Sequence, residues 1–174
     1  MTLSLSADQI QAMNAHAERT YPEECCGLML GQIQEGDTGF AQVNQRADST
    51  IRVVTALYPV ENSWDQQIAD DLQDESPQDK SSSKTRRYAI APEEMLKAMR
   101  VARCRNLDII GIYHSHPDRP AVPSECDRRL AWQHYSYSII SVQQGKAREF
   151  YSWSLDTNHQ FQLEPLVMLE TIPH

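Results

Sequence analysis

Two histidines one residue apart, followed at short range by a serine and an aspartate, form the stretch of the chain best suited to chemistry. Residues 108–113 form a short apolar run with β-branched residues, which predicts a buried strand. Alternate side chains of a strand share one face. His114 and His116 are therefore expected to point the same way. Three prolines then prevent continued pairing or an early helix, so the next helix should begin near Ser124 and bring Asp127 toward the histidines.

Two imidazoles and one carboxylate suit a divalent zinc ion with one open position. Structural zinc sites are usually closed by four protein ligands, whereas catalytic sites keep a place for water. Bound zinc lowers the pKa of that water from about 15.7 to about 7, which supplies a nucleophile at neutral pH. The sequence therefore predicts a catalytic zinc centre held by His114, His116 and Asp127.

The pair Ser124 and Asp127 also has a purely structural interpretation. A serine followed three residues later by an acidic residue can cap a helix start, and for this pair alone capping is the more frequent explanation. An isolated His-x-His is likewise mostly non-catalytic. Only the combination of His-x-His, a proline-rich loop and Ser-x-x-Asp is specific, because independent structural needs seldom produce all three. Cys126 lies within this stretch but is expected to stay outside the ligand set.

Residues 114–127 resemble the His-x-His-x7-Ser-x-x-Asp signature of the JAMM, or MPN-plus, metalloproteases, and the match is complete. Members of that family also carry a glutamate within a Pro-x-Glu-x-Cys-Gly run. Residues 22–27 fit this run with Glu24 in the catalytic place, while Glu23 is out of register by one. The resemblance extends from the first expected helix to about Val142 and implies the cytidine-deaminase-like JAMM/MPN fold of a short, prokaryotic-type member.

The resemblance implies a zinc-dependent hydrolase of peptide or isopeptide bonds. Glu24 would take a proton from the attacking water and deliver it to the leaving amine, and Ser124 would donate toward the developing oxyanion. The substrate would be a ubiquitin-like or sulfur-carrier protein, cleaved after its C-terminal glycine. A non-catalytic binding or scaffold module of the MPN type is the alternative, against which the intact ligand set argues. DNA-repair-associated relatives also share a His-x-His-Pro run, but differ in the residues that follow it.

The elements that must position these residues follow an α+β order. Helix and strand patterns alternate along the chain, and one curved, mostly antiparallel mixed sheet flanked by helices would account for this order. Helix signals predict helices from Ser6 to Tyr21, from Pro92 to Asn106 and from Glu125 to Gln133, with Leu130 and Ala131 facing inward on the last. Short β-rich runs predict strands at residues 25–31, 40–44, 51–58, 108–113, 137–142, 147–153 and 161–169.

Composition predicts one domain over residues 1–174. With 40% hydrophobic and 23% charged residues, the chain has an ordinary composition and enough length for a real core. Residues 63–87 depart from it, because clustered acidic residues and a serine run predict an exposed, partly disordered insertion. A short amphipathic helix at the start of this insertion is the alternative.

Charge and targeting signals restrict the partners. A net charge of −8 argues against a nucleic-acid surface, which would require a basic patch. No run approaches membrane-spanning length and no signal pattern opens the chain, so we expect no membrane partner and a cytoplasmic protein. The four cysteines form no C-x-x-C pair and are expected to be small buried hydrophobes. The oligomeric state stays open.

Overall fold

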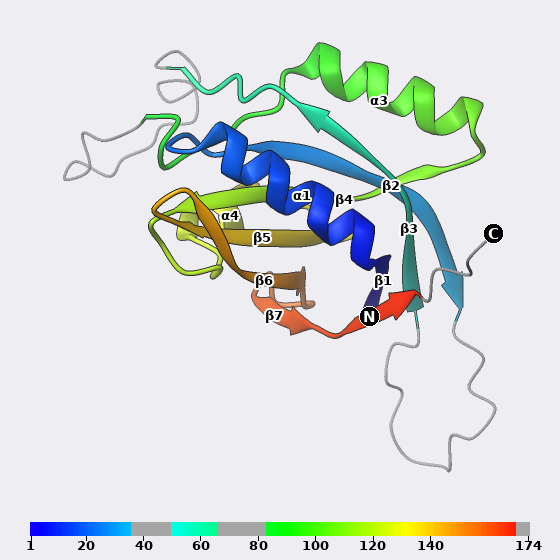
Figure 1. Ribbon diagram of the computed structural model, residues 1–174. Coiled ribbons are helices and arrows are strands. Elements are labelled where there is room, and N and C mark those ends of the chain that lie inside the picture. The colour runs from blue at the N-terminus through cyan, green and yellow to red at the C-terminus, as the bar shows by residue number, and fades with distance from the viewer. Residues whose placement is uncertain (36–49, 66–82, 170–174) are drawn as a thin grey trace.

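The computed structural model describes residues 1–35, 50–65 and 83–169. Within these residues, eight strands form one sheet in the order β7-β6-β5-β4-β2-β3-β1-β8 (Figure 1). Strands β1–β3, β1–β8 and β4–β5 pair in parallel, and the other neighbours pair antiparallel. The strands are β1 (Thr2–Ser6), β2 (Cys26–Glu35), β3 (Thr50–Val60), β4 (Asp108–Pro117), β5 (Ser136–Gln143), β6 (Lys146–Leu155), β7 (Phe161–Glu164) and β8 (Leu166–Leu169).

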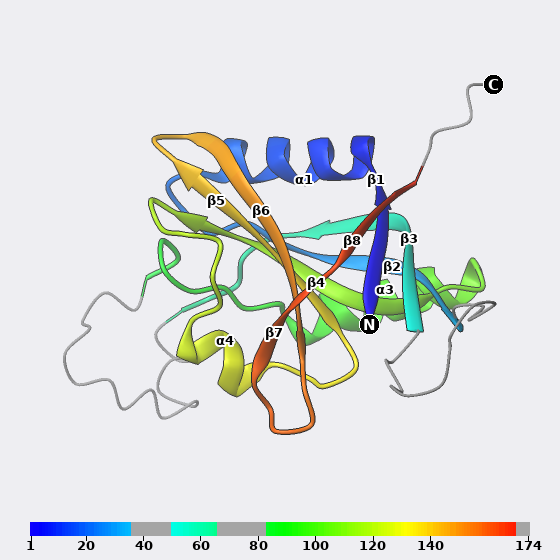
Figure 2. The ribbon, with the colours of Figure 1, turned by 90° about the horizontal axis from the view of Figure 1, so that it is seen from below.

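Two helices cover opposite faces of this sheet, as Figures 1 and 2 show, so its central strands are buried on both sides. The helices of the described residues are α1 (Ala7–Thr20), α3 (Pro92–Cys104) and α4 (Glu125–Leu130). Met29 of β2 joins the cluster packed by α1, while its neighbours Leu28 and Leu30 join the cluster packed by α3. None of the described helices is both long and apolar enough to cross a membrane.

The sheet closes on itself through the last two strands. β7 pairs with β6 at one edge and β8 pairs with β1 at the other, although only Pro165 separates them in the chain. In Figure 2, β7 and β8 follow one another across the open side of the sheet. Leu3 N donates to Pro165 O at 3.0 Å across this junction.

A buried ion pair lies under the closure. Arg52 Nη1 of β3 is 3.1 Å from Glu164 Oε1 of β7, and the two side chains are 3% and 0% exposed. Ser136 and Ser152 donate to the same carboxylate at 3.1 and 2.8 Å. Burial raises the pKa of Glu164, and these two serines and Arg52 oppose that rise. The pair is compensated by hydrogen bonds on both sides, which a buried charge requires.

The predicted α+β class, with a curved mixed sheet flanked by helices, is confirmed. α1 starts with a capping box between Ser6 and Gln9, and α3 starts with Pro92 in its first turn, as their sequences indicate. Residues at the start of each helix therefore determine where α1 and α3 begin.

Three element predictions need correction. β1 was not expected, because five residues before a helix start give too short a pattern. The single strand expected at residues 161–169 is two strands, because Pro165 has no N–H to continue a ladder. The last helix ends at Leu130 and does not reach Gln133. Leu130 is also 44% exposed and does not face inward, whereas Ala131 is buried.

The predicted insertion at residues 63–87 lies mostly outside the described residues, as does the strand expected at residues 40–44. The first residues of the insertion are described, and they are anchored. Trp64 is 2% exposed, and Ser63 N donates to Ala89 O at 3.0 Å. The chain is therefore buried where exposure was expected to begin.

The cysteines agree with their predicted reduced state but only in part with their predicted burial. All four are free. Cys25 and Cys26 are buried in the core, whereas Cys104 is exposed and Cys126 is half-buried. Cys126 lies on the short helix α4, beside the site described next.

Candidate metal centre

The end of β4 and the first turn of α4 bring three ligand atoms to one point. His114 Nε2 lies 3.1 Å from His116 Nε2 and 3.3 Å from Asp127 Oδ1. His116 Nε2 lies 3.6 Å from Asp127 Oδ2. A tetrahedral ion with bonds of about 2.0–2.1 Å requires ligand atoms about 3.3–3.4 Å apart. These residues therefore fit one small divalent ion.

Each histidine is held in a form that can bind metal. His116 Nδ1 lies 2.9 Å from Pro120 O, and donation to that carbonyl leaves the Nε2 lone pair free. The His114 ring stacks on Tyr88, with centroids 4.5 Å apart and planes 26° apart. Burial lowers the pKa of His114 to about 3, so this imidazole stays neutral at neutral pH. Neutral imidazole is the form that metals bind.

Ser124 and Asp127 form the capping box that their spacing suggested. Ser124 Oγ accepts from Asp127 N at 3.1 Å, and Asp127 Oδ2 accepts from both N and Oγ of Ser124 at 2.6 Å. The two interpretations of this pair are compatible, because capping leaves Oδ1 directed at His114. Burial by itself would raise the pKa of Asp127, but His114 and His116 in their protonated forms, together with the hydrogen bond from Ser124, outweigh burial and lower it.

Glu24 lies two residues before β2 and is tied to the strand that carries the histidines. Cys25 N donates to Ser115 Oγ at 2.8 Å, and Ser115 N donates to Cys25 O at 3.1 Å. Glu24 is 2% exposed, whereas Glu23 is exposed. Burial raises the pKa of Glu24 to about 8, and Arg119 is the first of the groups that oppose this rise.

Asn62 connects the Glu24 segment to the chain that carries Tyr88. Its Nδ2 donates to Glu24 O at 3.0 Å and to Arg87 O at 2.9 Å. Its Oδ1 accepts from Ala89 N at 3.2 Å. One buried amide thus fixes two segments that lie on either side of the site.

The glycine of the Pro-x-Glu-x-Cys-Gly run has a steric explanation. A Cβ at Gly27 would lie 2.4 Å from ring atoms of Tyr113, which is fully buried. Tyr113 in turn lies 3.0 Å through its hydroxyl from His16 Nδ1 on α1. The glycine lets this ring pack across β2, next to the residues that lead to Glu24.

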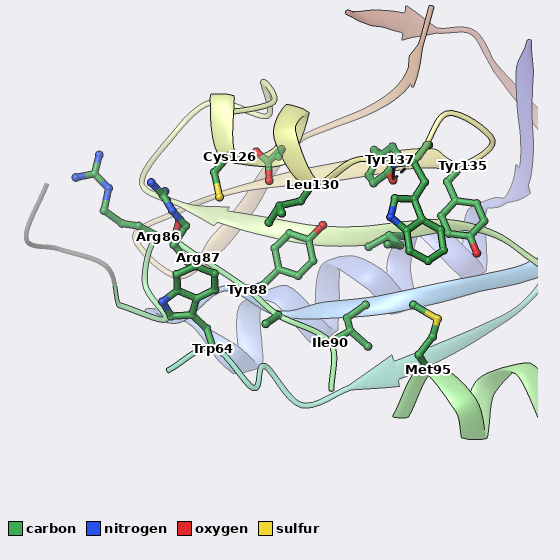
Figure 3. Close-up of a pocket in the computed structure, with 14 residues that line it drawn as sticks. Trp64, Arg86, Arg87, Tyr88, Ile90, Met95, Cys126, Leu130, Tyr135 and Tyr137 are labelled. Carbon is green, nitrogen blue, oxygen red and sulfur yellow. Dashed lines mark hydrogen bonds between the residues drawn. The ribbon is translucent and has the colours of Figure 1, made fainter. Parts of the chain in front are cut away.

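An apolar cleft of about 220 Å³ adjoins the ligand set (Figure 3). Asp127 lines it, and the Tyr88 ring projects into its middle, with Trp64 to one side and Tyr135 to the other. Tyr88 thus lines the cleft and also stacks on His114. The aromatic residues that line the cleft are Trp64, Tyr88, Trp132, Tyr135 and Tyr137.

The predicted site residues therefore do not all belong to one cluster. His114, His116 and Asp127 form a cluster of metal-ligand type among the described residues, and Cys126 is not part of it. Sequence reasoning missed Tyr88 and Arg119. Neither carries a motif, and only the position of Arg119 inside the proline-rich loop could have drawn attention to it.

Fold and ligand set together define a class of protein, and comparison with known proteins agrees. The family model for prokaryotic homologs of the JAB domain, Prok-JAB, matches residues 6–156. The chain belongs to this family, which confirms the resemblance drawn from its motifs. A desampylase of Haloferax volcanii is 30% identical over 145 residues, which cover 80% of each of the two chains.

Two solved structures are similar over nearly the whole chain. Protein DSY2949 from Desulfitobacterium hafniense is 28% identical with a TM-score of 0.70, covering 98% of this chain and 94% of its own. A protein from Salinibacter ruber is 27% identical with a TM-score of 0.62, covering 99% and 94%.

Proposed function

We propose that the protein is a zinc-dependent metallopeptidase or isopeptidase that cleaves after the C-terminal glycine of a ubiquitin-like or sulfur-carrier protein. The observation that carries this proposal is the convergence of His114 Nε2, His116 Nε2 and Asp127 Oδ1, because it leaves a fourth position open. The name of the Haloferax volcanii relative, desampylase, agrees with a substrate that carries a ubiquitin-like modifier.

Zinc held by these three residues would polarise the scissile carbonyl and supply hydroxide at neutral pH. Glu24 accepts the proton of the attacking water and passes it to the leaving amine, which requires a carboxylate close to the reacting atoms. Ser124 orients Asp127 through the capping box, in which its one hydroxyl hydrogen is donated to Asp127 Oδ2. As the candidate donor to the developing oxyanion, this hydroxyl would have to turn from Asp127 to the substrate. Burial raises the pKa of Glu24, and zinc held by the three ligands would oppose this rise, since a nearby positive charge favours the carboxylate.

The apolar cleft supports a peptide substrate. Its aromatic walls and the ligand Asp127 border the same space, so a chain lying in the cleft would reach the ligand set. The cleft and ligand set are therefore compatible with a peptide substrate.

The metal is tested first. Protein purified without added metal should hold one zinc per chain by elemental analysis. His114→Ala/His116→Ala should lose it, and His134→Ala, which changes an exposed histidine outside the cluster, should keep it. Full retention in the double variant would contradict the ligand set.

The activity is tested with a sulfur-carrier or ubiquitin-like protein that ends in Gly-Gly followed by a peptide, or joined to a lysine side chain. Mass spectrometry should find release after the second glycine, and a chelator should abolish it. Tight binding of such a protein without release by the zinc-loaded enzyme would instead identify a non-catalytic module.

A further inference from the structure

Arg119 lies in the loop between β4 and α4, and its guanidinium contacts the carboxylate of Glu24. The contact joins Arg119 Nη2 to Glu24 Oε1. The Glu24 side chain is 2% exposed and that of Arg119 is 23% exposed, so the pair sits at the boundary between core and solvent. Arg87 also acts on the Glu24 carboxylate through its charge, but among the described residues only Arg119 forms an ion pair with it.

The loop that carries Arg119 is fixed independently of this contact. Ser141 Oγ, on β5, donates to Arg119 O at 2.7 Å. The next residue, Pro120, offers its carbonyl to Nδ1 of the metal ligand His116 at 2.9 Å. The guanidinium is therefore presented to Glu24 by a backbone that also orients a ligand of the metal site.

Resting on the proposed function, we propose that Arg119 is a positioning residue for the general base: its ion pair holds Glu24 Oε1, so that the other oxygen can face the attacking water. A buried carboxylate without a counter-charge is costly, and a free one would sample several rotamers.

The contact joins two segments that are distant in the chain. Arg119 reaches Glu24, 95 residues away in sequence, through Nη2. The contact therefore links the loop before α4 to the segment before β2.

The pair is tested first without any activity, in metal-free protein at about pH 9, above the pKa of about 8 that burial gives Glu24 in the parent. Thermal unfolding is compared for the parent, Arg119→Met, Glu24→Gln and the double variant. Arg119→Met should lower Tm by about 2–4 °C, and should lower it much less when Glu24 is already glutamine, since no buried charge is then left unpaired. Arg105→Met, at an exposed position after α3, is the matched control and should leave Tm unchanged. Equal losses in both backgrounds would overturn the proposal.

The positioning role is tested in zinc-loaded protein on the Gly-Gly substrate. Arg119→Met should lower kcat about 10- to 100-fold with KM within about 2-fold, because Arg119 acts on proton transfer and not on substrate binding. Arg119→Lys should retain more activity, and added guanidinium ion should restore part of the kcat of Arg119→Met. In the Glu24→Gln background, Arg119→Met should cause no further loss.

The contrary outcomes are distinct. A raised KM with unchanged kcat would make Arg119 a substrate-binding residue, and loss of zinc from Arg119→Met would give it a structural role in the metal loop. A multiplicative loss in the Glu24→Gln background would show that it acts independently of Glu24. If the parent cleaves no such substrate, the proposed function fails, while the unfolding comparison still decides whether the pair exists.

Discussion

At the residue scale, the ligand atoms meet because two of the three ligands are bound on both sides. His116 uses Nδ1 to hold Pro120 and directs Nε2 to the common point. Asp127 uses Oδ2 to bind Ser124 and directs Oδ1 to His114. His114 differs, because its Nδ1 is buried without a hydrogen-bond partner and the ring is held by stacking on Tyr88. A second contact of the kind that His116 and Asp127 make pre-organises a metal site.

Glu24, and not Glu23, is the predicted general base. Glu24→Gln should keep zinc and fold, because the amide is nearly isosteric, and should lower kcat about 10²- to 10⁴-fold. Glu23→Gln is the matched control, since that side chain is exposed and should leave kcat unchanged. Initial rates of Gly-Gly cleavage, with zinc content measured in each sample, decide between the two. An active Glu24→Gln beside an inactive Glu23→Gln would show that the register is wrong.

At the element scale, α4 is only six residues long, so its start determines where Asp127 lies. The helix begins directly after a proline-rich loop, and Ser124 Oγ accepts from the backbone N–H of Asp127, which would otherwise lack a partner. The same serine binds Asp127 Oδ2. Cap and ligand orientation therefore depend on one hydroxyl.

Ser124→Ala is predicted to change both properties. Loss of the cap should lower the free energy of unfolding by about 0.5–2 kcal/mol, and loss of the contact with Asp127 should weaken zinc binding about 10- to 100-fold. Ser124→Thr keeps the hydroxyl and should restore both. Urea unfolding and a competition titration with a zinc indicator measure the two effects. Zinc affinity unchanged in Ser124→Ala would separate the cap from the ligand.

At the scale of the whole molecule, the sheet is held closed at the junction of β7 and β8. The ion pair of Arg52 and Glu164 joins β3 to β7 below that junction, and the serines of β5 and β6 complete it. The pair links the edge strand β7 to β3, which lies two strands from the opposite edge, so closure and the polar network depend on each other.

Breaking this pair on one side should cost more than removing it. Arg52→Met leaves the Glu164 carboxylate buried and unpaired, and should lower the free energy of unfolding by about 3–5 kcal/mol. Arg52→Met/Glu164→Leu should recover much of this loss. Urea unfolding at neutral pH is the measurement. A double variant less stable than Arg52→Met would contradict this account of the closure.

The local parts of the fold and site could be predicted from the sequence, because they depend on neighbouring residues. The clustering of His114, His116 and Asp127 follows from strand alternation and a delayed helix start, and Ser6 and Pro92 mark helix starts through caps and dihedral preference. The family resemblance rested on the same short runs.

Only the tertiary structure decided which distant segments meet at the site. The contact of Arg119 with Glu24 and the stacking of Tyr88 on His114 join residues from different elements, and no spacing rule connects them. Closure of the sheet at Pro165 likewise depends on where β1 lies, and the exposure of Leu130 depends on how little covers α4. Propensity and periodicity describe a residue and its neighbours along the chain, whereas these contacts arise from packing two covered faces of one sheet, which is set by topology.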